Sequence, residues 1–182
     1  MNHKNNTMNK VAFGKFGPPR PFNSDPFGAK ALLDKGISHK IYDKVTFTSY
    51  TDEEIDELNS FIDKDRDYIF NYKGLTIFYD KYCMNYSKTK KLELPQHVYM
   101  RVSMALMINE KHRIYRVKEL YDVISQHQAT LATPIMLNAG TPSQQLSSCV
   151  LNALSDDTHS ILDSNKNLGI YSKFKGGTAL DV

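Results

Sequence analysis

Cys149 is the residue of this sequence that is best suited to redox chemistry. It follows Ser148 in a short apolar segment, with glycine-containing turns and polar residues on either side. A thiol in such a position can give up electrons and form a disulfide with a second thiol. The structural alternative is that Cys149 is a small buried hydrophobe in a strand. The other cysteine, Cys83, stands in a predicted helix, where the structural alternative is the stronger one.

Hydroxyl, carboxylate and glycine residues near Cys149 are suited to an anionic ligand that carries a sugar. Thr133 precedes Pro134, so we expect an extended backbone there. The Thr133 hydroxyl is then either a donor to an anion or an ordinary loop group. The Asp-Asp-Thr run at 156–158 either caps the next helix or accepts hydrogen bonds from a ribose, and its first carboxylate is expected to do both. The pair Gly176–Gly177 either lets a phosphate approach backbone amides or ends that helix.

Composition and charge exclude several classes of protein. The 182 residues are 41% hydrophobic and 24% charged, which is ordinary for a soluble globular chain. Lysine and arginine total 23 against 20 acidic residues, and this net charge of +3 is too small and dispersed to indicate nucleic acid or a membrane as partner. No apolar run approaches the roughly 20 residues of a membrane span, and residues 1–10 lack a signal-peptide core. Two distant cysteines form neither a disulfide framework nor a zinc pattern, so a reducing, cytoplasmic setting is expected.

A layer of helices is expected ahead of Cys149, over about residues 51–127. The run Thr51–Glu54 has the spacing of a capping box, with a hydroxyl at the cap and a carboxylate in the first turn. Pro95 suits the first turn of a later helix, because its missing N–H costs nothing there. The apolar positions that repeat with helical spacing are Ile55, Leu58 and Ile62; Leu75, Phe78, Tyr79 and Tyr82; Val98, Val102 and Ala105; and Ile114, Val117, Tyr121 and Ile124. Before this layer, residues 1–30 are expected to form an irregular arm rich in proline and glycine.

The pattern then changes, and a strand, a helix and a second strand are expected. Segment 148–154 is predicted to be a strand, and Cys149–Leu151 within it form the nearly continuous apolar run expected in a covered sheet. Residues 156–158 are good helix-start residues, and their helix is expected to run to about residue 173. A second strand is expected from residue 178 to residue 182, where the sequence looks cut. Strand, helix, strand opens an α/β domain, so we predict a helical domain over 31–128 and an incomplete α/β domain over 129–182.

The residues between Thr133 and Cys149 carry a family resemblance. Ala132–Pro142 reads Ala-Thr-Pro-Ile-Met-Leu-Asn-Ala-Gly-Thr-Pro, and Gln145–Leu151 reads Gln-Leu-Ser-Ser-Cys-Val-Leu. Together these runs resemble the large, catalytic alpha subunit of class I ribonucleotide reductase. Upstream, segments 61–67, 72–82 and 95–105 look like the amino-terminal helical domain of that subunit. The resemblance covers about residues 31–182, and it implies an α-helical amino-terminal domain followed by the start of a ten-stranded α/β barrel, cut short.

The resemblance implies roles for individual residues. Cys149 matches one of two thiols that reduce the 2′ carbon of the ribose, and the partner cysteine is absent from this sequence. The family's substrate-binding positions match Thr133, Ser148, Cys149 and Gly177. Its effector-binding positions match Asp156, Asp157, Thr158 and Lys173, with the register between Asp156 and Asp157 left open. The helix that begins at Thr158 is expected at a two-fold dimer interface.

The activity that the resemblance implies is the reduction of ribonucleoside diphosphates to deoxyribonucleoside diphosphates for DNA replication. The implied partners are a radical-generating, metal-containing small subunit, thioredoxin or glutaredoxin, a second copy of the chain, and a complementary carboxyl-terminal fragment of the large subunit. Deoxynucleotides or ATP are the implied effectors, and the chain itself is expected to bind no cofactor or metal. Because the radical residues are not in this sequence, we expect no activity from the chain alone. The alternatives are a non-catalytic nucleotide-binding remnant and a small helical protein that binds nothing.

Overall fold

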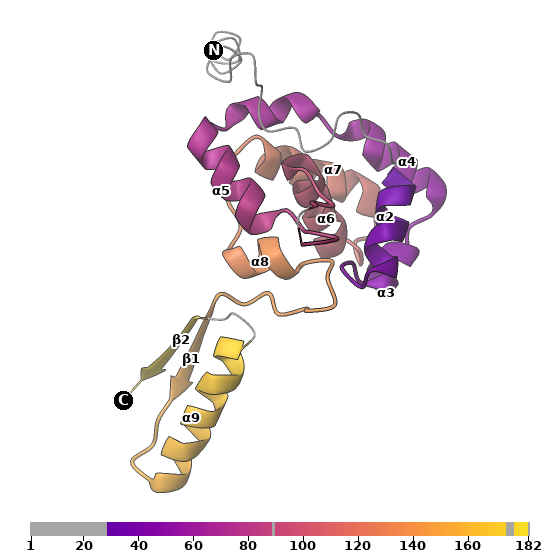
Figure 1. The fold of residues 1–182 in the computed structure, drawn as a ribbon. Helices are drawn as coiled ribbons and strands as arrows, with labels where there is room; N and C mark the ends of the chain where they lie inside the picture. The colour runs from indigo at the N-terminus through magenta and orange to yellow at the C-terminus, as the bar shows by residue number, and fades with distance from the viewer. Residues whose placement is uncertain (1–28, 89, 174–176, 182) are drawn as a thin grey trace.

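The computed structural model describes residues 29–88, 90–173 and 177–181, which form a body of helices followed by a strand–helix–strand unit (Figure 1). The body contains α2 (Ala29–Ser38), α3 (Lys44–Thr48), α4 (Asp52–Phe61), the 3₁₀ helix η2 (Lys64–Ile69), α5 (Tyr72–Tyr82), α6 (Pro95–Leu106), α7 (Arg113–Ser125) and α8 (Thr133–Asn138). The unit contains β1 (Cys149–Ala153), α9 (Thr158–Lys173) and β2 (Gly177–Asp181). The arm predicted for residues 1–30 lies almost entirely outside the described residues, as does Gly176.

Two helices of the body, α4 and α6, begin at the residues that local sequence signals predicted. At α4 the Thr51 hydroxyl accepts from the Glu54 N–H at 3.3 Å, and the Glu54 carboxylate accepts from the Thr51 N–H at 2.9 Å. This reciprocal pair is the predicted capping box. Pro95 is the first residue of α6, where a missing N–H breaks no hydrogen bond. The prediction of a helical layer over residues 51–127 is therefore confirmed.

The core of the body lies around α6, near the centre of the helices in Figure 1. Val98 and Val102 of α6 and Val117 and Tyr121 of α7 have no exposed surface, and the two helices pack against each other. Elements α3, α5, η2 and α8 also contact α6. The apolar positions that repeat along the sequence are thus the positions that bury the helices against one another.

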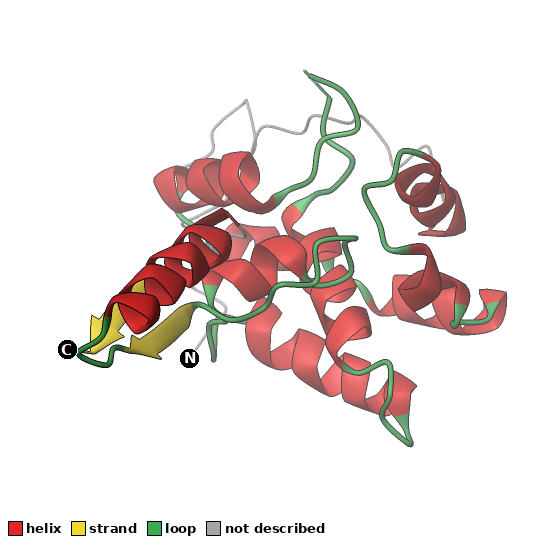
Figure 2. Cartoon of the chain, turned by 90° about the horizontal axis from the view of Figure 1, so that it is seen from below, coloured by secondary structure: helices red, strands yellow, loops and turns green. Residues whose placement is uncertain are grey.

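The strand–helix–strand unit is a parallel pair of strands with α9 against one face (Figure 2). Exposure alternates along β1, and Leu151 on the outer face is 78% exposed. The predicted order of strand, helix and strand is confirmed, but the prediction of a strand covered on both faces was wrong for the described residues. Side chains alternate between the faces of a strand, and α9 covers only one of them. Two strands are what the described residues contain, so the start of a ten-stranded barrel is not established.

The backbone at Thr133 differs from the prediction. We expected an extended residue in a loop, whereas Thr133 is the first residue of α8 and Ala132 before it is extended, with φ −59° and ψ 146°. The restriction that a proline imposes on its predecessor is a preference, and Pro134 fits the first helical turn because its absent N–H would have no partner there. The hydroxyl of Thr133 is consequently held by a helix that packs on α6.

A membrane-spanning helix was not expected from the sequence. Within the part of the chain that the structure describes, no helix combines the length and the apolar character needed to cross a membrane.

Candidate functional site

The start of the strand pair brings together three of the predicted substrate-binding residues. The N–H of Gly177 donates to the carbonyl of Ser148 at 2.8 Å, and Cys149 pairs with Gly177 in the parallel register. A β-carbon on residue 177 would lie 2.9 Å from that carbonyl oxygen, closer than real contacts allow. Glycine is therefore required for the close approach of the two strands.

The thiol of Cys149 is exposed at this position. The structural alternative, a small buried hydrophobe, does not fit the described residues. A solvent-accessible thiol can exchange with another thiol or disulfide, which a buried thiol cannot do without opening of the fold. The other cysteine, Cys83, is buried in the helical core, and burial raises the pKa of its thiol well above the usual value. Cys83 is thus the structural cysteine that the sequence indicated.

The side chain of Thr133 contacts α5, and among the described residues it forms no hydrogen bond with the strand pair. Its hydroxyl oxygen is 3.1 Å from the Tyr82 hydroxyl oxygen, and the Lys81 ammonium donates to it at 3.4 Å. Helix α8 carries Thr133 on the side of the body from which the chain continues to β1 (Figure 1). The substrate-binding residues predicted from the sequence therefore form two groups, one on α8 and one on the strand pair.

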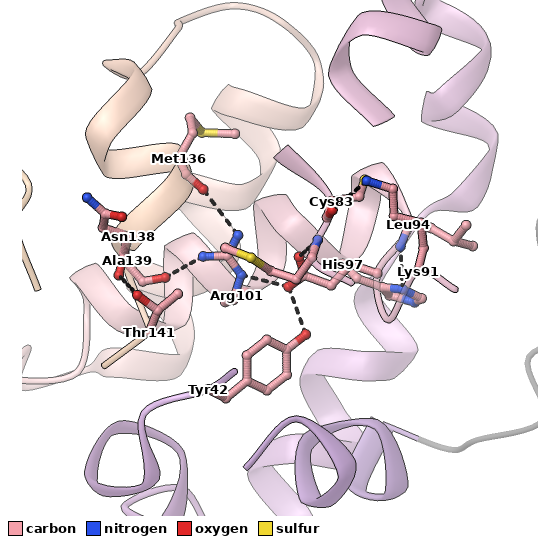
Figure 3. Close-up of polar contacts among 12 residues, drawn as sticks. Tyr42, Cys83, Lys91, Leu94, His97, Arg101, Met136, Asn138, Ala139 and Thr141 are labelled. Atoms are coloured by element: carbon pink, nitrogen blue, oxygen red, sulfur yellow. Dashed lines mark hydrogen bonds and ion pairs between the residues drawn. The ribbon is translucent and has the colours of Figure 1, made fainter. Parts of the chain in front are cut away.

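A buried ion pair anchors the other end of α8 (Figure 3). The Arg101 guanidinium donates from Nε to Oε1 of Glu93 at 2.6 Å, and the side chains are 2% and 0% exposed. Arg101 also donates to two main-chain carbonyls of the α8 region, that of Met136 at 3.1 Å and that of Ala139. An arginine with five donors and a planar fork can serve all three acceptors at once. The pair thereby ties α6 to the carboxyl-terminal end of α8.

Glu93 is held by two further donors. The Tyr42 hydroxyl donates to Oε1 at 2.7 Å and the Met84 N–H donates to Oε2 at 2.9 Å. Burial, and then the negative charge of Glu93, raise the pKa of Tyr42 well above its usual value, so this tyrosine remains a neutral donor. Sequence reasoning missed this cluster. The available signal was a single charged residue, Arg101, inside the otherwise apolar stretch of α6.

The carboxylates at the start of α9 have different roles. Asp157 caps the helix, because its Oδ1 accepts from the N–H groups of His159 at 2.8 Å and Ser160 at 3.1 Å. We expected the first carboxylate, Asp156, to provide the cap, and this was wrong: the geometry of the first turn brings those N–H groups to Asp157. Asp156 and Thr158 are exposed beside it.

The fourth predicted effector residue is far from the other three. Lys173 is the last residue of α9, whereas Thr158 is the first. At a rise of 1.5 Å per residue, the helix separates them by roughly 22 Å. The structure therefore brings Asp156, Asp157 and Thr158 together and leaves Lys173 at the opposite end.

The described residues offer no metal centre. Over the ranges given above, no group of three or more histidine, cysteine or acidic side chains is arranged to hold a metal ion.

Comparisons with known proteins agree with the sequence motif. Residues 68–144 match the family model described as ribonucleotide reductase, all-alpha domain. The chain is 38% identical over 128 residues to the ribonucleoside-diphosphate reductase subunit alpha of Helicobacter pylori, with 70% of the chain and 16% of the relative covered. It is 32% identical over 181 residues to ribonucleoside-diphosphate reductase 1 subunit alpha of Escherichia coli, with 96% of the chain and 22% of the relative covered. The chain thus spans about a fifth of the length of the curated relatives that it matches.

Proposed function

The chain belongs to the ribonucleotide reductase large-subunit family and matches its amino-terminal part, and from this premise we propose that it contributes to the reduction of ribonucleoside diphosphates. The observation that carries the proposal is the exposed Cys149 thiol beside the close contact between Ser148 and Gly177. An accessible thiol next to a main-chain cradle is what a reductant of a bound sugar needs.

The proposed chemistry requires two thiols. The C–O bond at the ribose 2′ carbon breaks, a C–H bond forms, the oxygen leaves as water, and the two thiols supply two electrons as they become a disulfide. Cys149 is one of these thiols. Cys83 is unsuited to be the other, because it is buried in the helical core and its thiol resists ionisation. The second thiol and the radical initiator are accordingly proposed to come from outside residues 1–182.

The proposed partners supply the second thiol, the radical and the reductant that this proposal requires from outside residues 1–182. A small subunit that contains a metal supplies the radical, a further large-subunit segment supplies the second thiol, and thioredoxin or glutaredoxin reduces the disulfide after each turnover. Deoxynucleotide or ATP effectors are proposed to bind at residues 156–158. Helix α9 is proposed as a homodimer contact, since it exposes Leu162 at 61% and Ile170 at 44%, two residues that lie about 80° apart around the helix.

The decisive experiment mixes the chain with a polypeptide that carries the rest of a large subunit, together with a radical-generating small subunit and a dithiol. We expect deoxynucleotide formation from the mixture and none from the chain alone. Cys149→Ser should abolish multiple turnover while leaving diphosphate binding intact, because oxygen replaces sulfur at similar volume but forms no disulfide. Cys83→Ser is the matched control and should retain turnover in samples that remain folded by circular dichroism.

Two outcomes would overturn the proposal. Multiple turnover by the Cys149→Ser mixture would mean that this thiol is not a reductant. Diphosphate binding without any deoxynucleotide product would instead favour the non-catalytic nucleotide-binding remnant. A thiol reagent provides an independent check on the native chain, since it should label Cys149 rapidly and Cys83 only after unfolding.

A further inference from the structure

A lysine converges with two hydroxyl groups at the start of α8. The Lys81 ammonium is 3.4 Å from the Thr133 hydroxyl oxygen and 5.0 Å from the centre of the Tyr82 ring. The Tyr82 hydroxyl oxygen is 3.1 Å from the same threonine oxygen. Lys81 and Tyr82 end α5, so segments separated by about fifty positions along the chain meet here.

The Lys81 ammonium retains capacity for a ligand. An ammonium group has three N–H donors, and the contact with Thr133 uses one of them. Within the described ranges no carboxylate pairs with Lys81, whereas Lys118 pairs with Glu57 at 2.7 Å. Lys81 is also an exposed residue. An anion that approaches Thr133 therefore meets a lysine whose charge is not already neutralised.

Helix capping does not account for the position of Lys81. A lysine in the last turn of a helix commonly binds the unsatisfied carbonyl groups there. At the end of α5 this role is taken by Lys91, which donates to the carbonyl of Asp80 at 3.2 Å and to that of Cys83 at 2.9 Å. Lys81 is directed to Thr133 instead.

Tyr82 orients the threonine hydroxyl. Its ring is half-buried and packs on Phe78 with ring centres 5.0 Å apart, so the phenol is held in place. When Tyr82 donates to the oxygen of Thr133, the threonine proton is directed to another acceptor. A phosphate oxygen near Thr133 then receives one hydrogen bond from the threonine and a charge-assisted one from Lys81.

We propose that Lys81 is a further substrate-binding residue, which binds the diphosphate group together with Thr133, whose hydroxyl is oriented by Tyr82. The proposal rests on the proposed function, because that function supplies the diphosphate. Thr133, Ser148 and Gly177 offer hydroxyl and main-chain donors to the diphosphate, and Lys81 would add a positive charge.

The test measures binding of inorganic pyrophosphate, CDP and cytidine to the full chain by titration calorimetry or NMR. Lys81→Met should weaken pyrophosphate and CDP binding about tenfold at low salt, because a charge-assisted hydrogen bond is lost at an exposed position. Lys81→Arg should restore most of the affinity, and cytidine binding should not depend on Lys81. The difference should shrink at high salt because exposed charges are screened. The matched control is Lys73→Met, an exposed lysine near the start of the same helix, which should bind as the unchanged chain does.

The proposal is overturned if the chain shows no measurable pyrophosphate binding, if Lys81→Met binds pyrophosphate normally, or if Lys73→Met weakens binding equally. In the reconstituted mixture, Lys81→Met should raise the KM for CDP with little change in kcat. Turnover that requires Cys149 but is indifferent to Lys81 would overturn this proposal alone. Turnover that is indifferent to Cys149 would overturn the proposed function instead.

Discussion

Replacing Glu93 by glutamine should destabilise the chain more than any exposed charge substitution. The carboxylate is fully buried and accepts hydrogen bonds from Arg101, Tyr42 and the Met84 main chain. Glutamine keeps the shape but removes the charge and turns one oxygen into an NH₂ donor. In either orientation of the amide, its NH₂ group faces a group that donated a hydrogen bond to the carboxylate, either Arg101 and Tyr42 or the Met84 N–H. Arg101 meanwhile keeps its charge in a site where its side chain is only 2% exposed.

The size of the effect follows from this burial. Removing one partner of a buried ion pair costs about 3–5 kcal/mol, because the remaining charge is neither solvated nor neutralised. A domain of ordinary stability has about 5–15 kcal/mol in total, so Glu93→Gln should remove roughly a fifth of it or more. For a chain of this length, the loss corresponds to a fall in Tm of roughly 6–20 °C.

Urea unfolding followed by circular dichroism measures this loss, and a double-mutant cycle assigns it to the pair. Arg101→Met should also destabilise, but the double variant should lose less than the sum of the two single variants, because no unpaired charge remains. Glu57→Gln is the control. Glu57 pairs with Lys118 at the surface, where its side chain is 53% exposed, and its loss should cost less than about 1 kcal/mol. A Glu93→Gln variant within about 1 kcal/mol of the unchanged chain, or an additive cycle, would refute the reasoning.

Three further predictions concern pH, capping and a glycine. Burial raises the pKa of Asp67 to about 6, so the folded state binds its proton more tightly than the unfolded state does. The free energy of unfolding should therefore fall as the pH rises from about 4 to about 6. The urea midpoint of the unchanged chain should decrease as the pH is raised across this range, and that of Asp67→Asn should not. Asp157→Ala should destabilise α9 by about 0.5–2 kcal/mol, whereas Asp156→Ala should leave the Tm unchanged, because Asp157 provides the cap. Gly140→Ala should cost roughly 2–4 kcal/mol, since φ is +73° and the added carbon would lie 2.9 Å from the Phe47 ring; a normal urea midpoint would contradict this.

The sequence by itself determined the features that depend on near neighbours along the chain. The capping box at Thr51–Glu54, the helix start at Pro95 and the apolar repeat of α6 and α7 are encoded within a few turns, so they could be predicted. The order of strand, helix and strand after residue 147 has the same local origin, as does the motif that indicated the reductase family. The cap of α9 was predicted one residue too early, at Asp156 and not at Asp157. Local reasoning is not fine enough here, because one residue changes the direction of a side chain by about 100° around a helix.

Only the tertiary structure decided which side chains meet across the fold. No local pattern indicates that Glu93 and Arg101 meet, and they become a buried pair because α6 is enclosed by its neighbours. The meeting of Lys81 with Thr133 depends on how α5 and α8 pack, which no local pattern specifies. The exposure of Cys149 likewise depends on α9 covering one face of the strand pair and leaving the other open. Burial and long-range contact depend on the whole packing arrangement, and they govern the energy of these charged and reactive groups far more than the identity of sequence neighbours does.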